Sequence, residues 1–91
     1  MKKYIIEREI AGIGGFDSSQ YKAAAQKSNQ ALAELGDDIK WLESYVAQDQ
    51  TFCVYMATGE EIIMEHSRLS GFPANRITEI VSSFGPGTAE D

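Results

Sequence analysis

A few side chains able to bind a ligand or take part in a reaction are spread along this sequence. His66 is the single histidine and Cys53 the single cysteine. A histidine can act as a metal ligand or a proton shuttle, and a cysteine becomes a nucleophile when a base lies beside it. The spacing of Ile62, His66 and Leu69 places the imidazole on the buried side of a helix. Simpler alternatives are a core-edge histidine with one hydrogen bond and a cysteine that packs as a small apolar side chain.

Aromatic and acidic residues alternate in two neighbouring segments. Trp41, Glu43 and Tyr45 recur at every second position of the first, and Cys53 and Tyr55 do so in the second. Residues two apart on a strand point to the same face, and aromatic walls with a few placed polar groups are typical of small-ligand pockets. We predict that these five residues line a ligand pocket. The alternative is that the aromatic side chains only pack at an interface.

The pairing register of the two segments decides which residues share a face. A hairpin loop with an odd number of residues groups the five pocket candidates together. It leaves the remaining side chains, Leu42, Val46, Phe52, Val54 and Met56, to pack against the helices. We prefer this register because an even loop would place Glu43 among aliphatic side chains.

Six elements must position these side chains. Runs rich in β-branched and aromatic residues predict four strands, at residues 3–8, 39–48, 51–57 and 76–83. Helical spacing predicts a first helix that follows an Asp17–Gln20 capping box and stops at Gly36. A second capping box, Thr58 with Glu61, predicts a helix that ends at Gly71.

The predicted order β-α-β-β-α-β is typical of an α+β, ferredoxin-like fold. We expect a four-stranded antiparallel sheet with both helices on one face, in a single domain of residues 1–84. Residues 85–91 are rich in turn formers and acidic, so we expect a flexible tail. A single cysteine excludes an iron–sulfur cluster, which needs several.

The strand at residues 51–57 is apolar at nearly every position, so neither of its faces suits water. A sheet that meets solvent on one face should alternate apolar and polar residues. We therefore predict that a second copy of the chain covers the face without helices, as in dimeric α+β barrels. The alternative is a central strand with a few exposed aromatic residues.

The overall charge narrows the class of partner. The net charge is −6 and the isoelectric point is about 4.6, so nucleic acids and anionic membranes would be repelled. No apolar run approaches the roughly 20 residues that span a bilayer. The lone cysteine and an N-terminus without a signal-peptide core lead us to expect a cytoplasmic protein.

Several segments together resemble a small bacterial family catalogued as domain of unknown function 4242, which includes a nickel-binding, nickel-responsive member. Its most specific part is Glu65-His66-Ser67-Arg68-Leu69-Ser70-Gly71-Phe72-Pro73-Ala74, and the resemblance covers about residues 3–81. The other matching segments are 4–8, 44–46, 52–57 and 77–80. The resemblance implies a ferredoxin-like subunit, a homodimer and divalent metal binding.

By position, the resemblance implies Glu7 or Arg8, together with His66, as metal ligands. A guanidinium does not bind a metal ion, so Glu7 takes that role. Nickel favours imidazole, and one histidine per subunit means that two subunits supply two at most. A weaker site in which oxygen atoms bind a divalent cation therefore remains an alternative.

Three functions remain on these grounds. The first is a non-enzymatic dimer that holds a divalent metal ion, nickel-like, or a small molecule in a pocket between the sheet and the partner subunit. The second is a cofactor-free monooxygenase or isomerase that would use Glu43, Tyr45, Tyr55 and His66 around an aromatic cavity, an analogy that rests on fold alone. The third is an interaction module without a pocket. We rank the binding protein first.

Overall fold

The chain follows the predicted β-α-β-β-α-β order, as the computed structural model of residues 1–90 shows. The main elements are β1 (Lys2–Glu9), α1 (Ser18–Leu35), β2 (Ile39–Val46), β3 (Gln50–Ala57), α2 (Glu60–Ser70) and β4 (Arg76–Ile80). Three short 3₁₀ turns join or follow them, η1 (Ile13–Gly15), η2 (Gly36–Asp38) and η3 (Pro86–Glu90).

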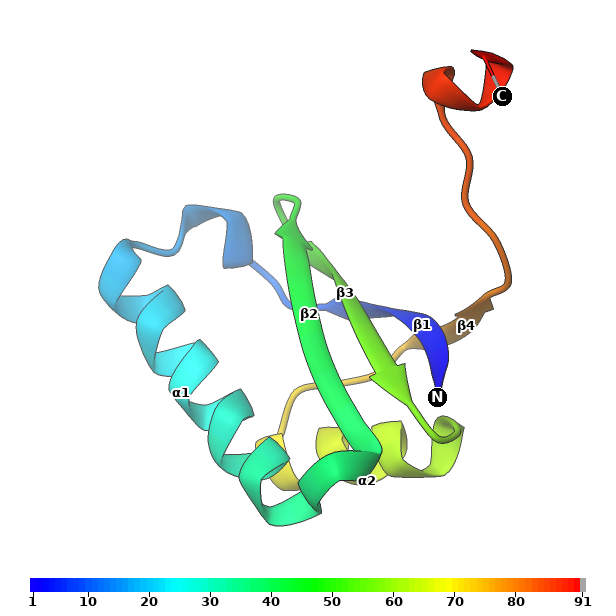
Figure 1. The fold of residues 1–91 in the computed structure, drawn as a ribbon. Coiled ribbons are helices and arrows are strands. Elements are labelled where there is room, and N and C mark those ends of the chain that lie inside the picture. Colours follow the sequence, from blue (N-terminus) through cyan, green and yellow to red (C-terminus); the bar gives the residue numbers. More distant parts are fainter. Residues whose placement is uncertain (91) are drawn as a thin grey trace.

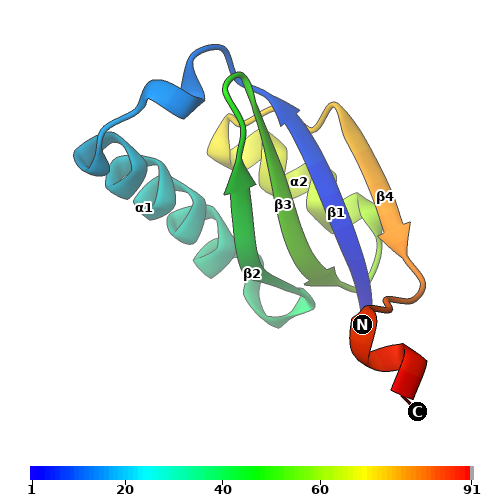
Figure 2. The same cartoon turned by 90° about the horizontal axis from the view of Figure 1, so that it is seen from above.

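The four strands form one antiparallel sheet in the order β2-β3-β1-β4. Both helices lie on one side of this sheet, and α1 lies toward the β2 edge (Figures 1 and 2). This arrangement confirms the α+β, ferredoxin-like fold class. We call the side that carries the helices the helix face and the other side the open face.

The helix ends follow local sequence signals in three of four cases. Asp17 accepts a hydrogen bond from the Gln20 backbone N–H, and Gln20 returns one to Asp17, so the predicted capping box is confirmed. Gly36 and Gly71 end the two helices with φ of 77° and 79°, values that glycine adopts without strain. The second capping box is wrong, because α2 is capped by Gly59 with no side-chain hydrogen bond.

The core lies between the helices and the helix face. Tyr4 and Ile6 of β1, Cys53 and Tyr55 of β3, and Ile63 of α2 are all buried there. The sequence predicted the opposite arrangement, with Phe52, Val54 and Met56 in this layer. Because β3 is apolar on both faces, hydrophobicity alone could not choose between them.

The predicted hairpin register is wrong beside the turn. Val46 pairs with Thr51 and Glu43 pairs with Val54, so Glu43 lies on the open face. A β-bulge between Trp41 and Glu43 then shifts the pairing, and Trp41 lies opposite Tyr55 on the helix face. A bulge adds one residue to one strand and so reverses which side chains face the core.

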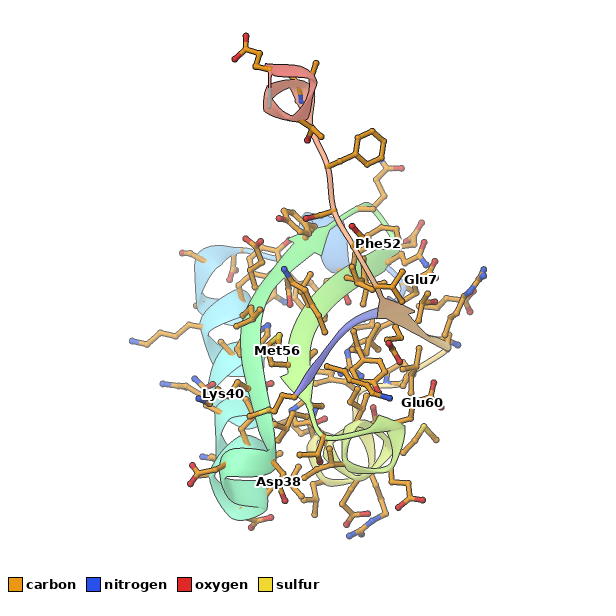
Figure 3. The ribbon with its side chains drawn as sticks, turned by 45° about the vertical axis from the view of Figure 1, so that its right-hand side comes forward. Glu7, Asp38, Lys40, Phe52, Met56 and Glu60 are labelled. Atoms are coloured by element: carbon orange, nitrogen blue, oxygen red, sulfur yellow. The ribbon has the colours of Figure 1, made fainter. Side chains whose placement is uncertain are left out.

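The open face mixes apolar and charged residues. Ile5, Phe52 and Met56 are half-buried, and Val54 between them is 8% exposed. Glu7 pairs with Phe52 and Lys40 pairs with Met56, so charged side chains border the apolar ones (Figure 3).

β4 ends at Ile80, three residues before the predicted end. The chain then runs away from the sheet (Figure 1), and residues 81–90 are exposed. Two large apolar side chains in this segment, Val81 and Phe84, are 87% and 90% exposed. The last residue of the predicted tail, 91, lies outside the described residues. Within residues 1–90, no helix combines the length and hydropathy that crossing a membrane requires.

Candidate functional site

A cavity of about 270 Å³ lies on the helix face between α1 and the sheet. Its wall is mostly apolar, with α1 on one side, the strands β1, β2 and β3 on the other, and Ile13 of η1 at one end. The residues that line it include Arg8, Ala25, Ser28, Trp41, Cys53 and Tyr55. The cavity exists because α1 lies toward the β2 edge, where its small residues Ala24 and Ala25 face the strands.

Arg8 is the one charged side chain in the cavity wall. It is 2% exposed because Tyr4, Ile6 and Arg8 alternate along β1 toward the helix face. Its Nη1 donates to Ser67 Oγ at 3.0 Å and to the carbonyl oxygens of Phe72 and Pro73 at 3.3 and 2.7 Å. Its Nη2 is buried and has no hydrogen-bond partner among the described residues.

His66 lies next to the cavity wall without lining it. The imidazole is fully buried, its Nε2 is 3.2 Å from Ser28 Oγ, and its Nδ1 has no partner among residues 1–90. The Tyr55 ring lies 5.4 Å away, centroid to centroid. Burial lowers the pKa of His66 below its usual range, and the positive charge of Arg8 lowers it further. The imidazole is therefore neutral at pH 7.

The Tyr55 ring lies next to both His66 and Arg8. Its ring centroid is 6.0 Å from the guanidinium carbon of Arg8, within the range of a cation–π contact. Burial raises the pKa of the Tyr55 phenol, which the Arg8 charge partly opposes. Cys53 is buried beside it, and its Sγ lies 3.5 Å from Thr51 Oγ1. No base contacts this thiol among the hydrogen bonds of the described residues, which favours the packing role for Cys53.

The structure separates the five predicted pocket residues into two groups. Trp41, Cys53 and Tyr55 line the cavity. Glu43 and Tyr45 lie on the open face, where the Tyr45 hydroxyl donates to Glu43 Oε1 at 2.6 Å in an exposed pair. That hydrogen bond raises the pKa of the Tyr45 phenol. The residues named for the enzyme hypothesis are divided in the same way, so they do not surround one cavity.

The two predicted metal ligands also lie on opposite faces of the sheet. Glu7 faces away from the helices and lies 3.7 Å from Arg76 Nε in an ion pair. His66 is sealed on the helix side, near the Arg8 charge. Residues 1–90 contain no cluster of three or more histidine, cysteine, aspartate or glutamate side chains placed to hold a metal ion.

Comparison with known proteins places the chain in a family. The family described as "Nickel responsive protein SCO4226-like" matches residues 4–80. This chain belongs to the SCO4226-like nickel-responsive family. The crystal structure of SCO4226 from Streptomyces coelicolor A3(2) superposes with a TM-score of 0.73 at 16% sequence identity, covering 90% of this chain and 99% of that one. No curated protein matches the chain.

Membership in the SCO4226-like family confirms the nickel-responsive family that the sequence resembles. The catalogue name, domain of unknown function 4242, is not tested by this match. At 16% identity, the similarity to SCO4226 supports the fold alone.

Sequence reasoning dismissed Arg8 as a metal ligand and gave it no other role in a site, although a signal was present. Tyr4 and Ile6 share its parity, so an arginine continues the buried side of a strand. A charged residue at a core position is unusual and marks a candidate site.

Proposed function

We propose that this protein is a non-enzymatic, homodimeric binding protein that holds a small molecule between α1 and the sheet. The observation that carries the proposal is the apolar cavity of about 270 Å³. A cavity of roughly 150 Å³ holds a benzene ring, and pockets for drug-sized ligands begin near about 300 Å³. The cavity therefore suits one ring or a short chain with a substituent.

The homodimer is supported by the character of the open face. Ile5, Phe52 and Met56 are only half-buried there, beside the largely buried Val54. Val81 and Phe84 add two highly exposed apolar side chains just beyond β4. Apolar surfaces of this kind commonly mark protein interfaces.

The single tryptophan provides the test, because Trp41 lines the cavity. We expect its emission to change when small cyclic and aliphatic compounds are titrated into the protein. Ala25→Leu should abolish the change, since the longer side chain fills the cavity from α1. The matched control is Ala23→Leu, which adds the same atoms at an exposed position of the same helix. Binding that survives Ala25→Leu unchanged would exclude this cavity as the site.

A second candidate is binding of a divalent metal ion such as nickel, which family membership favours. The residues of one subunit do not fit such a site. His66 and Glu7 are separated by the sheet, the buried Arg8 charge opposes a cation near His66, and no ligand cluster exists in residues 1–90. Metal binding would thus need ligands from two subunits, and Glu7 on the open face is the one that a partner could reach.

Thermal unfolding with and without Ni²⁺ tests the metal candidate, because a ligand of the folded state raises the melting temperature. Metal bound at Glu7 predicts a shift that Glu7→Gln removes and Glu60→Gln, at an exposed position of α2, retains. The absence of a shift at millimolar Ni²⁺ would reject this candidate.

A further inference from the structure

We infer that the ligand of the cavity carries a carboxylate, which binds the guanidinium of Arg8 while an apolar body fills the remaining space. This inference rests on the proposed binding function of the same cavity. It adds the chemical class of the ligand, a small apolar monocarboxylate.

The first support is the charge of the cavity wall. Arg8 is its single charged residue, and no aspartate or glutamate lines it. The ion pairs of the described residues involve Lys2, Arg68 and Arg76, and none reaches Arg8. Thirteen of the fourteen acidic residues fall within residues 1–90, and none of these thirteen forms an ion pair with this buried cation.

The second support is the incomplete hydrogen bonding of the guanidinium. All acceptors around Arg8 Nη1 are neutral, namely one hydroxyl and two carbonyl oxygens just past the C-terminal end of α2. The negative end of a helix dipole offsets only part of a full charge. Buried charges in proteins are normally paired, whereas Arg8 Nη2 is buried without a hydrogen-bond partner among the described residues.

The third support is the match between a carboxylate and the site. A carboxylate accepts hydrogen bonds from the arginine fork and neutralises one charge. A phosphate monoester carries closer to two negative charges at pH 7, and the cavity wall offers only one cation. The largely apolar remainder of the wall, including Ala25 and Trp41, suits a hydrocarbon body.

A purely structural role for Arg8 is the competing explanation. Its Nη1 fastens the segment after α2 to β1 through Phe72 and Pro73. That role requires no preference for an acidic ligand. The two explanations are distinguished by comparing ligands of one shape that differ only in charge.

The experiment titrates Trp41 fluorescence of the full chain at pH 7 with pairs of compounds. The pairs are cyclohexanecarboxylate, hexanoate and phenylacetate, each with its amide. We expect at least one carboxylate to bind about 10- to 100-fold more tightly than its amide, as for hydrogen bonds to charged groups. Arg8→Gln should remove that advantage, and Arg8→Lys should keep part of it because the charge remains without the fork. Arg76→Gln, an exposed arginine of the open face, is the matched control and should leave it intact.

The outcomes separate this inference from the proposed function. If acids and amides bind equally and Ala25→Leu blocks both, the cavity is a binding site but the carboxylate assignment is overturned. If neither class binds in a manner sensitive to Ala25→Leu, the proposed function fails and the inference fails with it. The comparison of acid with amide in the wild-type protein needs no variant, so it decides the point even where Arg8→Gln does not fold.

Discussion

Two nitrogen-bearing side chains, Arg8 and His66, are buried in this small domain, which is unusual for residues of these types. Both lie on the helix side of the sheet, and both contact the Tyr55 ring. Each retains one nitrogen without a hydrogen-bond partner among the described residues. An unsatisfied buried donor or acceptor costs about 1–3 kcal/mol. Arg8 lines the cavity, so a ligand bound there would offset part of this cost, whereas His66 lies outside the cavity wall.

Acidification should destabilise the protein through His66. The pKa of the imidazole is near 6.5 in the unfolded chain and lower in the folded one, because the ring is buried and lies near the Arg8 charge. The Tyr55 ring of β3 packs against it. Between those two values the unfolded chain binds more protons, so stability is present above about pH 6.5 and is lost as the pH falls below it. The slope for one proton is at most about 1.4 kcal/mol per pH unit.

Urea unfolding between pH 5 and 8 measures this dependence. His66→Gln should flatten the curve in that range. The lowered pKa values of Asp17 and Glu65 act below it, because their ordinary values are 3.8 and 4.5. An equal slope in the wild-type protein and His66→Gln would contradict the assignment.

At the scale of elements, one close approach fixes the end of the cavity. Gly14 of η1 donates its backbone N–H to the Gln48 carbonyl at 2.9 Å, joining this turn to the β2–β3 hairpin. A Cβ at Gly14 would lie 2.7 Å from backbone atoms of Ala47 and Gln48, whereas one at Gly15 would meet nothing within 4 Å. The Gly-rich segment thus has a packing role next to Ile13, a cavity residue.

Gly14→Ala should therefore lower the free energy of unfolding by about 1–3 kcal/mol, the usual cost of overpacking. Gly15→Ala is the matched control and should change it little. Chemical denaturation of both variants measures the difference, and equal stability of the two would refute the contact.

The start of α2 offers a second prediction at this scale. Gly59 occupies the N-cap without a side-chain hydrogen bond, in an extended conformation open to any residue. Gly59→Ser should raise the free energy of unfolding by a few tenths of a kcal/mol, because a serine hydroxyl can accept from the first turn. Thr58→Ala should have no comparable effect, since Thr58 does not cap the helix. If Thr58→Ala lowered the free energy of unfolding by more than a few tenths of a kcal/mol, the capping box predicted from the sequence would be supported after all.

At the scale of the whole molecule, the open face and the cavity lie on opposite sides of one sheet. The proposed dimer contact therefore need not enclose the ligand, in contrast to the pocket expected between sheet and partner. Val54 is central in this surface, opposite Ile5 on one neighbouring strand and Glu43 on the other.

Sedimentation should give about twice the 10.0 kDa chain mass at micromolar concentration. Val54→Lys should shift the protein toward the single-chain mass, because a buried charge at an interface is costly. Met64→Lys makes the same kind of change at an exposed position of α2 and should leave the mass unchanged. A single-chain mass for the wild-type protein would exclude the dimer, while ligand titrations could still support the cavity.

The order of elements, the first capping box, the glycine stops and the inward position of His66 were all predictable from the amino-acid sequence. These features depend on neighbours a few residues apart, so local periodicity and backbone preference are sufficient to predict them.

The face of β3 that meets the helices, and hence the location of the cavity, depends on long-range packing and could not be predicted. Both faces of this strand are apolar, so burial favours neither strongly, and the bulge between Trp41 and Glu43 reverses side-chain direction within β2. The position of α1 toward the β2 edge, and the lack of a hydrogen-bond partner for Arg8 Nη2 within residues 1–90, depend on contacts between residues far apart in the chain. Those contacts form only when the helices and the sheet pack together, which is why the five predicted pocket residues separated into two groups.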